Sequence, residues 1–319
     1  MNWFGDTREY YGERWFKGME LAYPDMWRRF DSAVASATLV KRTPTPDRVA
    51  VILSGGGSDG PWIPGYVCEG LADAGVIGAP YSAPNAYAIY LVAKELGKNK
   101  GVLLMYNNFM GDYLNNDMAA ELLCLEGYDV DVIPICDDMG MAIGESRENR
   151  GGRIAVAYMT KLAAAAAKRG QSLAQIGALV RKASNRASTL CACVDVERNT
   201  VTYGNGFSGE PGFQVKTDTS LEETAVEMIR LLTEELSPAP GERAYLMVNR
   251  MYLTSYADSY IMAGYLHKAL SQRMPVQQMR VGAYTNILDH YGFTVTLLCA
   301  DDEIGGYLDG KVCGDSYML

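Results

Sequence analysis

Three consecutive glycines that follow a short apolar run are the first residues of this sequence that could bind a ligand. Residues 47–54 (DRVAVILS) are rich in β-branched side chains and lead directly into Gly55, Gly56 and Gly57. This pattern is typical of a buried strand that delivers a glycine-rich loop, whose amide groups can approach anionic or hydroxyl oxygens closely. Because no Gly-Lys-Ser/Thr follows and the G-x-G-x-x-G spacing is missing, we expect neither a nucleotide phosphate loop nor a dinucleotide site. A tight turn without a ligand is the alternative.

Asp112 lies in the segment after the predicted strand 101–106 and carries a carboxyl group that could accept a proton. Burial can raise the pKa of a carboxyl group towards neutrality, where the group can take the proton of a substrate hydroxyl. A helix is predicted to begin near Tyr113, so Asp112 is equally suited to cap that helix. The sequence leaves both interpretations open.

Histidine, the usual residue for proton transfer near neutral pH, is scarce in this chain. Only His267 and His290 occur among 319 residues. His267 lies within a predicted helix, and neither histidine falls in a recognisable site motif. We therefore interpret both as surface or satisfied core side chains rather than catalytic ones.

The cysteines indicate reduced thiols rather than disulfides or a metal site. They are odd in number, they are scattered through apolar stretches, and a polar start takes the place of a signal peptide, as in a cytosolic protein. Cys191 and Cys193 are predicted to be alternate residues of a buried strand, since structural zinc sites favour wider spacing and a second pair. The full set is Cys68, Cys124, Cys136, Cys191, Cys193, Cys299 and Cys313.

The composition indicates a globular protein of two domains. The chain has 319 residues, of which 48% are hydrophobic and 21% charged, as in folded proteins large enough for two cores. The formal net charge is -9, so no basic field favours nucleic acid. No apolar run has the length of a bilayer span, so we expect a cytoplasmic protein that does not bind a membrane.

Strands and helices are predicted to alternate in the first half of the chain. Strands are expected at 47–54, 101–106 and 130–136, with helices near 85–96 and 113–125. This order predicts an α/β domain with a largely parallel sheet. Ligands of such sheets bind beyond the carboxyl ends of the strands, so the loops after Ser54 and Tyr106 are the places to look.

The pattern changes after residue 185, where we place a domain boundary that divides the chain into 1–184 and 185–319. Ser172 is predicted to cap one helix, and Ser220 with Glu223 to form the capping box of another. Before this boundary, helices are expected at 153–169 and 173–183. After it, helices are expected at 221–236 and 257–272, and strands at 189–196, 244–249, 279–284 and 293–299.

The chain resembles the substrate-binding K subunit of dihydroxyacetone kinase over almost its whole length. The matching segments follow the family's order and spacing, and the ordered set is far more specific than any one of them. They are LSGGGS at 53–58, GVLL at 101–104, NFMGD at 108–112, RGG at 150–152, SGEPG at 208–212, GAY at 282–284, LD at 288–289, GF at 292–293 and DDE at 301–303. The resemblance implies two α/β domains with the substrate site between them, and a working homodimer.

The resemblance also implies a chemistry whose histidines are missing here. In that family, a histidine of the pattern G-x-H-G-E-P-G attacks a ketone to form a covalent hemiaminal, but this chain has Ser208 at that position. A second histidine, which assists deprotonation, is replaced by Gly60, and a common lysine by Asn107, whereas the family's aspartate aligns with Asp112. Serine is a poor nucleophile without a general base, so we expect Ser208 to form hydrogen bonds rather than a covalent adduct.

These observations leave functions of different classes open. One is a divergent kinase subunit that acts on a small polyol, ketose or related compound; another is a non-catalytic regulator or scaffold; a third is a different reaction on a sugar phosphate. Because the chain has no nucleotide motif, we expect no cofactor on it and a nucleotide or other phosphoryl donor on a separate partner, such as a nucleotide-binding L-type subunit. The predicted site residues are Asp112 as catalytic base and, for substrate binding, Gly55, Gly56, Gly57, Asn107, Asn108, Ser208 and Glu210.

Overall fold

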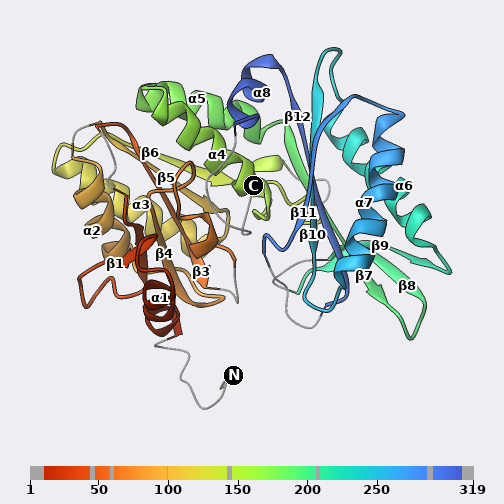
Figure 1. Ribbon diagram of the computed structural model, residues 1–319, viewed down its shortest axis with the longest axis horizontal. Coiled ribbons are helices and arrows are strands. Elements are labelled where there is room, and N and C mark those ends of the chain that lie inside the picture. The colour runs from red at the N-terminus through yellow and green to blue at the C-terminus, as the bar shows by residue number, and fades with distance from the viewer. Residues whose placement is uncertain are drawn as a thin grey trace. The chain divides into compact units, whose positions relative to one another are not determined.

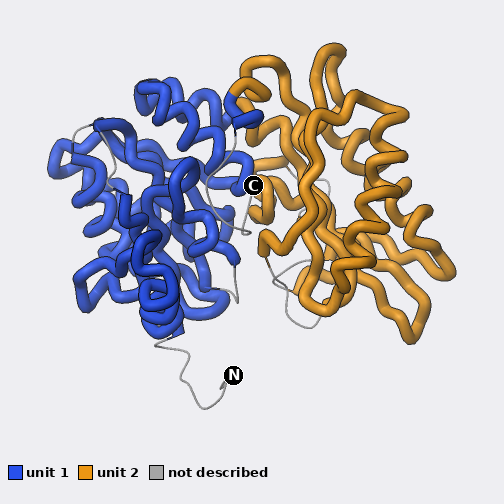
Figure 2. Tube along the Cα trace, viewed as in Figure 1, with its two compact units in different colours: residues 1–135, 156–181, 307–319 blue, residues 136–155, 182–306 orange. Residues whose placement is uncertain are grey.

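The protein, seen here as a computed structural model, is built from two α/β units (Figures 1 and 2). The described residues are 11–43, 47–57, 61–98, 100–141, 146–205, 209–285 and 290–310. The first unit comprises the described residues of 1–135, 156–181 and 307–319, and the second those of 136–155 and 182–306.

The units are not the two continuous segments, 1–184 and 185–319, that the sequence analysis proposed. The segment 136–155 belongs to the second unit, although it precedes the predicted boundary by many residues. The reason is a backbone pairing: Thr189 donates to the carbonyl of Asp137 at 2.7 Å, and Asp138 forms a parallel bridge with Thr189. Such pairing between distant segments leaves no local sequence signal.

The first unit contains a six-stranded sheet in the order β1-β2-β4-β3-β5-β6. β3 is parallel to β4 and β5, and β5 is parallel to β6, which confirms the prediction of a largely parallel sheet. β1, β2 and β4 were not predicted, and β1 and β2 add an antiparallel edge. The strands are β1 (Trp27–Arg29), β2 (Thr38–Lys41), β3 (Ala50–Gly57), β4 (Ala74–Pro80), β5 (Val102–Asn107) and β6 (Val130–Ile135).

Helices α2 and α3 pack on this sheet through an apolar core. Ile52 of β3 and Leu104 of β5 share one buried cluster with Ile89 of α2 and Leu123 of α3. Asn85 caps α2, because its side chain accepts a hydrogen bond from the Tyr87 amide at 2.8 Å. The helices that precede β7 (Ala187–Asp195) are α1 (Tyr11–Ala22), α2 (Ala86–Leu96), α3 (Met110–Leu125), α4 (Ala155–Lys168) and α5 (Leu173–Ser184), with single 3₁₀ turns at Pro64–Tyr66 and Arg147–Asn149.

The second unit contains a mostly antiparallel six-stranded sheet in the order β11-β10-β12-β7-β8-β9, in which only β10 and β11 run parallel. Its helices, α6 and α7, pack on one face of the sheet (Figure 1). The strands are β7 (Ala187–Asp195), β8 (Thr200–Asn205), β9 (Pro211–Thr217), β10 (Arg243–Arg250), β11 (Val276–Gly282) and β12 (Gly292–Ala300). The two covering helices are α6 (Leu221–Leu236) and α7 (Tyr256–Ser271), and a short helix, α8 (Asp302–Leu308), follows β12.

The two faces of the second sheet differ in chemistry. Side chains alternate along a strand, so Leu190 and Ala192 of β7 join the apolar core beneath α6 and α7. Thr189, Cys191 and Cys193 therefore point to the other face. The prediction that the two cysteines are alternate residues of a strand is confirmed.

Two predicted helix caps are also confirmed. The Ser220 hydroxyl accepts a hydrogen bond from the Glu223 amide, and the Glu223 carboxylate accepts one from the Ser220 amide, which is a complete capping box. Ser172 and Gln175 form the same reciprocal pair at the start of α5. Within the described ranges, no helix has the length and apolar character needed to cross a bilayer.

Candidate active site

The three glycines lie at the carboxyl end of β3, where close backbone packing requires them. A Cβ at Gly57 would lie 2.7 Å from the Gly78 carbonyl oxygen, and one at Gly56 would lie 3.1 Å from the Ser82 amide nitrogen. Gly55 faces Trp62, with an imagined Cβ 3.4 Å from the indole nitrogen. Packing against the end of β4 thus explains Gly57, and packing against the residues after β4 explains Gly56. The role of the glycine loop in ligand binding stays a prediction.

Asn107 and Asn108 lie at the same edge of the sheet, at the end of the neighbouring strand. β3 and β5 are parallel with Ser54 opposite Tyr106, so the residues that follow these two are neighbours. The Asn107 side chain is buried, and the Asn108 amide donates to the Ile135 carbonyl at 3.0 Å. The structure therefore brings the two asparagines and the glycines to one edge of the first unit.

Asp112 lies in the first turn of α3 and does not cap it. The helix begins at Met110, three residues before the predicted start, and its N-cap residue is Phe109, which makes no side-chain cap. The Asp112 side chain is 6% exposed, and its Oδ1 has no hydrogen-bond partner among the described residues. Burial raises the pKa of this carboxyl group to about 7.

A short chain of hydrogen bonds joins the end of β3 to the first turn of α3. The Ser54 hydroxyl donates to Oδ1 of Asn116 at 2.8 Å, and Nδ2 of Asn116 donates to the backbone carbonyl of Asp112 at 2.8 Å. Ser54 and Asn116 are both buried. Asn116 is not among the predicted site residues, and its only signal in the sequence is an amide side chain one helical turn after Asp112.

The remaining predicted residues lie elsewhere. Ser208, and Gly60 at the place of the second histidine, fall outside the described residues. Glu210 belongs to the second unit, where it is half-buried just before β9. Both histidines belong to the second unit, and His267 lies in α7 with its Nδ1 3.3 Å from the Ser271 hydroxyl.

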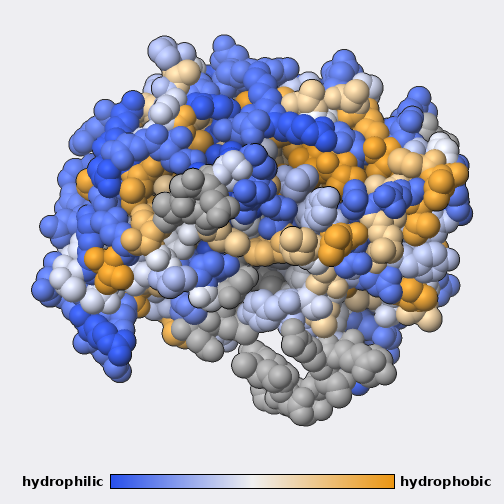
Figure 3. Space-filling view, turned by 180° about the vertical axis from the view of Figure 1, so that it is seen from behind, coloured by the Kyte–Doolittle hydropathy of each residue, from blue (hydrophilic) through white to orange (hydrophobic). Residues whose placement is uncertain are grey.

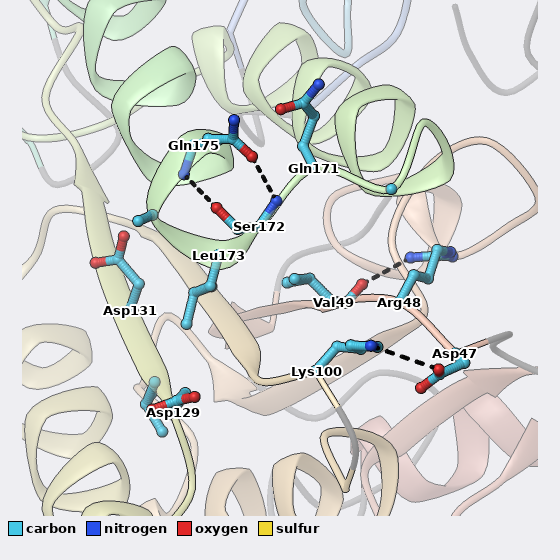
Figure 4. A pocket seen from close by; sticks show the side chains of 13 residues that line it. Asp47, Arg48, Val49, Lys100, Asp129, Asp131, Gln171, Ser172, Leu173 and Gln175 are labelled. Atoms are coloured by element: carbon cyan, nitrogen blue, oxygen red, sulfur yellow. Dashed lines mark hydrogen bonds and ion pairs between the residues drawn. The ribbon is translucent and has the colours of Figure 1, made fainter.

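A groove of about 960 Å³ lies at the opposite edge of the first sheet, beyond the amino ends of β3, β5 and β6 (Figure 4). It contains charges of both signs, among them Asp47 and Lys100, which are 3.6 Å apart. Arg48, also on its rim, is engaged by the buried carboxylate of Asp73 at 2.7 Å. Ligands of parallel sheets bind at the carboxyl ends of strands, so the edge that carries Asp112, and not this groove, stays the predicted position of the active site.

Comparisons with known proteins support the two-unit α/β fold. The chain is 29% identical over 276 residues to the dihydroxyacetone-binding subunit DhaK of a PTS-dependent dihydroxyacetone kinase of Listeria innocua, covering 82% of this chain and 83% of that protein. It is 28% identical to the L-erythrulose 1-kinase of Mycolicibacterium smegmatis, covering 90% of this chain and 53% of that one. A solved structure from work on the regulation of the dha operon of Lactococcus lactis matches with a TM-score of 0.88 at 25% identity, over 96% of this chain and 95% of that chain.

The Dak1 domain family matches residues 17–314, which include both sheets, the glycine loop and Asp112. The two-unit α/β fold, the parallel sheet of the first unit and the extent of this match lead to one conclusion: the chain belongs to the Dak1 domain family.

Proposed function

We propose that this chain is the substrate-binding subunit of a phosphotransferase that acts on a small hydroxylated or keto compound. The observation that carries the proposal is Asp112: a buried carboxyl group with an unpartnered Oδ1 among the described residues, at the ligand-binding edge of a parallel sheet. Burial holds its pKa at about 7, close to the value that suits a general base at neutral pH.

The proposed step is the transfer of a phosphoryl group to a substrate hydroxyl. The hydroxyl oxygen forms a bond to phosphorus while the bond between phosphorus and the donor's leaving group breaks, and the hydroxyl proton passes to the Asp112 carboxylate. The amides of the glycine loop, with Asn107 and Asn108, supply hydrogen bonds that orient the substrate. Stabilisation of the charge on the transferred group must come from the donor and its partner protein.

The substrate is proposed to bind without a covalent bond. The resemblance aligns Ser208 with the family's nucleophilic histidine, and a serine without an activating base does not attack a carbonyl. Hydrogen bonds alone select hydroxyl groups as readily as a carbonyl, so small polyols join ketoses as candidate ligands. The Mycolicibacterium relative, named for L-erythrulose, extends the candidates beyond dihydroxyacetone.

The phosphoryl donor is proposed to reside on another protein. The sequence has no phosphate-binding motif of its own, and a nucleotide-binding L-type subunit is the first candidate. A second candidate function, a ligand-binding regulator, is favoured by one observation, the 25% identity and TM-score of 0.88 to the structure from work on dha operon regulation.

Asp112→Asn tests the proposal. The chain is combined with an active L-type subunit, ATP and a panel of short ketoses and polyols, and phosphorylated product is measured between pH 6 and pH 9. Turnover should rise as pH rises through about 7, where Asp112 loses its proton, and should fall by about 10²-fold or more in the variant. Asp117→Asn, at an exposed position of the same helix, is the matched control and should leave turnover unchanged.

Two outcomes would contradict the kinase proposal. Equal turnover of Asp112→Asn and the parent protein would remove Asp112 from the chemistry. Ligand binding detected by calorimetry, with no product from any donor and partner, would favour the regulator.

A further inference from the structure

Three sulfur atoms of the second unit, two from β7 and one from the residue that follows β10, meet on the face of the sheet opposite α6 and α7. The Sγ atoms of Cys191 and Cys193 are 3.8 Å apart, and Cys193 Sγ lies 3.6 Å from Sδ of Met251. Cys191 and Met251 are fully buried, whereas Cys193 is half-buried. Met251 directly follows β10, 58 residues after Cys193, so the sequence spacing of the cysteines gives no sign of this third sulfur.

The geometry does not suit a disulfide. Alternate residues of an extended strand are about 6.6 Å apart with their Cβ atoms pointing the same way, whereas a disulfide brings Cβ atoms to about 3.8 Å. Closing a bond between Cys191 and Cys193 would therefore distort β7, which is paired along its length with β12 and β8. The sulfur separations are instead close to those of a bridge through one atom: sulfurs bound at about 2.3 Å to a common ion lie about 3.8 to 4.0 Å apart, depending on whether the ion is tetrahedral or trigonal.

We propose that Cys191, Cys193 and Met251 form a binding site for a soft monovalent metal ion, Cu(I). Two thiolates and a thioether are soft ligands, which select Cu(I), whereas zinc takes four thiolate, imidazole or carboxylate ligands. Within the described ranges, no group of three or more histidine, cysteine and acidic side chains is placed to hold a metal, so the proposed site needs Met251 as its third ligand. This site is independent of the function proposed for Asp112.

The surroundings of the sulfurs fit this use. Cys191 Sγ lies 3.4 Å from the side-chain Oδ1 of Asn205, whose amide, turned about its own axis, donates N–H to a thiolate instead. Cys193 is the ligand that reaches the surface, and it provides the entry path that a bound ion needs. Binding of the ion releases the two thiol protons, and the bound ion is coordinated by three sulfur atoms.

The test is an anaerobic titration of the full chain with Cu(I) against a bicinchoninate competitor. One ion per chain should bind at the site, and Cys193→Ser and Met251→Leu should each weaken that binding by about tenfold or more. Met251→Leu conserves volume in the core, and circular dichroism checks that each variant is folded. Cys124→Ser, which removes an exposed thiol of the first unit, is the control and should leave the affinity unchanged.

The competing explanation is adventitious binding by accessible thiols. It predicts that Cys124→Ser weakens binding as much as Cys193→Ser and that Met251→Leu has no effect, and that result would overturn the proposal. X-ray absorption spectroscopy of the copper-loaded parent protein identifies the atoms bound to copper without any variant. Sulfur ligands alone would support the proposed site, and nitrogen or oxygen ligands would refute it. Tighter binding of Zn(II) than Cu(I), unaffected by Met251→Leu, would also refute it.

Discussion

Asp112 shows how one buried side chain can link stability to chemistry. Its Oδ1 has no hydrogen-bond partner in the part of the chain that the structure describes, and burial raises the pKa of the carboxyl group from 3.8 to about 7. Burial gives the Asp112 carboxyl group a pKa that suits proton transfer from a substrate. The same burial means that the ionised carboxylate destabilises the folded protein when no ligand is bound. Function and folding are therefore opposed at this residue.

We predict that Asp112→Asn stabilises the protein at alkaline pH. A carboxyl pKa that is higher in the folded than in the unfolded state lowers the free energy of unfolding as pH rises from near 4 through 7, and the full cost is present above that range. The neutral amide avoids this cost, so the variant should be more stable by about 1–3 kcal/mol at pH 8 and by almost nothing at pH 4. Urea unfolding at the two pH values measures the difference.

The exposed Asp117 of the same helix provides the comparison. Asp117→Asn should change the free energy of unfolding by less than about 0.5 kcal/mol at either pH. A stability gain of Asp112→Asn that is the same at pH 4 and pH 8 would mean that the ionisation of Asp112 is not its source.

At the scale of elements, Asn116 is the connection between β3 and α3. Its amide accepts from Ser54 at the end of the strand and donates to the backbone of Asp112 in the first turn of the helix. Hydrogen bonds of the Asn116 side chain thus link the strand end that carries the glycine loop to the helical turn that carries the Asp112 carboxyl group. We infer that Asn116 is a positioning residue for the proposed base.

We predict that Asn116→Ala lowers both stability and turnover. The substitution leaves the buried Ser54 hydroxyl without its acceptor and opens a cavity, which together should cost about 2–4 kcal/mol of unfolding free energy. Turnover should fall through kcat more than through KM, because the base is displaced while the ligand contacts remain. Chemical denaturation and steady-state kinetics measure the two effects.

Asn115→Ala is the matched control, since Asn115 bonds to the carbonyl of Gly111 in the same helix at an exposed position. Its effect on stability should stay below about 0.5 kcal/mol. A kcat of Asn116→Ala equal to that of the parent protein would show that the link between β3 and α3 has no part in placing Asp112.

At the scale of the whole molecule, apolar side chains lie exposed in several patches on the surface (Figure 3). Tyr256, Tyr260 and Ile261 of α7 are 64%, 62% and 50% exposed, and exposed clusters of this kind often mark a protein interface. The net charge of -9 repels the phosphate backbone of nucleic acid. A second copy of the chain is the partner that we expect, in line with the family resemblance.

We predict a homodimer in solution that uses this face of α7. Light scattering should give about twice the chain mass of 34.9 kDa. Tyr260→Glu should shift the protein towards the monomer, because it places a charge in an apolar contact. Met118→Glu alters an equally exposed residue of α3 and should leave the dimer intact. A monomeric parent protein at micromolar concentration would contradict the prediction, and a dimer lost only in Met118→Glu would move the interface to α3.

The sequence by itself determined the features that local chemistry controls. The apolar run before the glycines predicts β3, and the alternation of strands with helices predicts a parallel sheet, because each pattern depends on residues close together in the chain. The capping box of Ser220 and Glu223 is local for the same reason. The ordered motifs likewise led to the family that the whole-chain match shows.

Only the tertiary structure decided the features that depend on distant neighbours. β1, β2 and β4 carry too few residues or too weak a pattern to be found alone, and the pairing of Asp138 with Thr189 assigns 136–155 to the second unit. Asp112 is a base candidate rather than a cap because α3 begins at Met110. Tertiary packing buries Asp112, leaves its Oδ1 without a partner among the described residues and brings Met251 to Cys193. No spacing along the chain specifies these contacts.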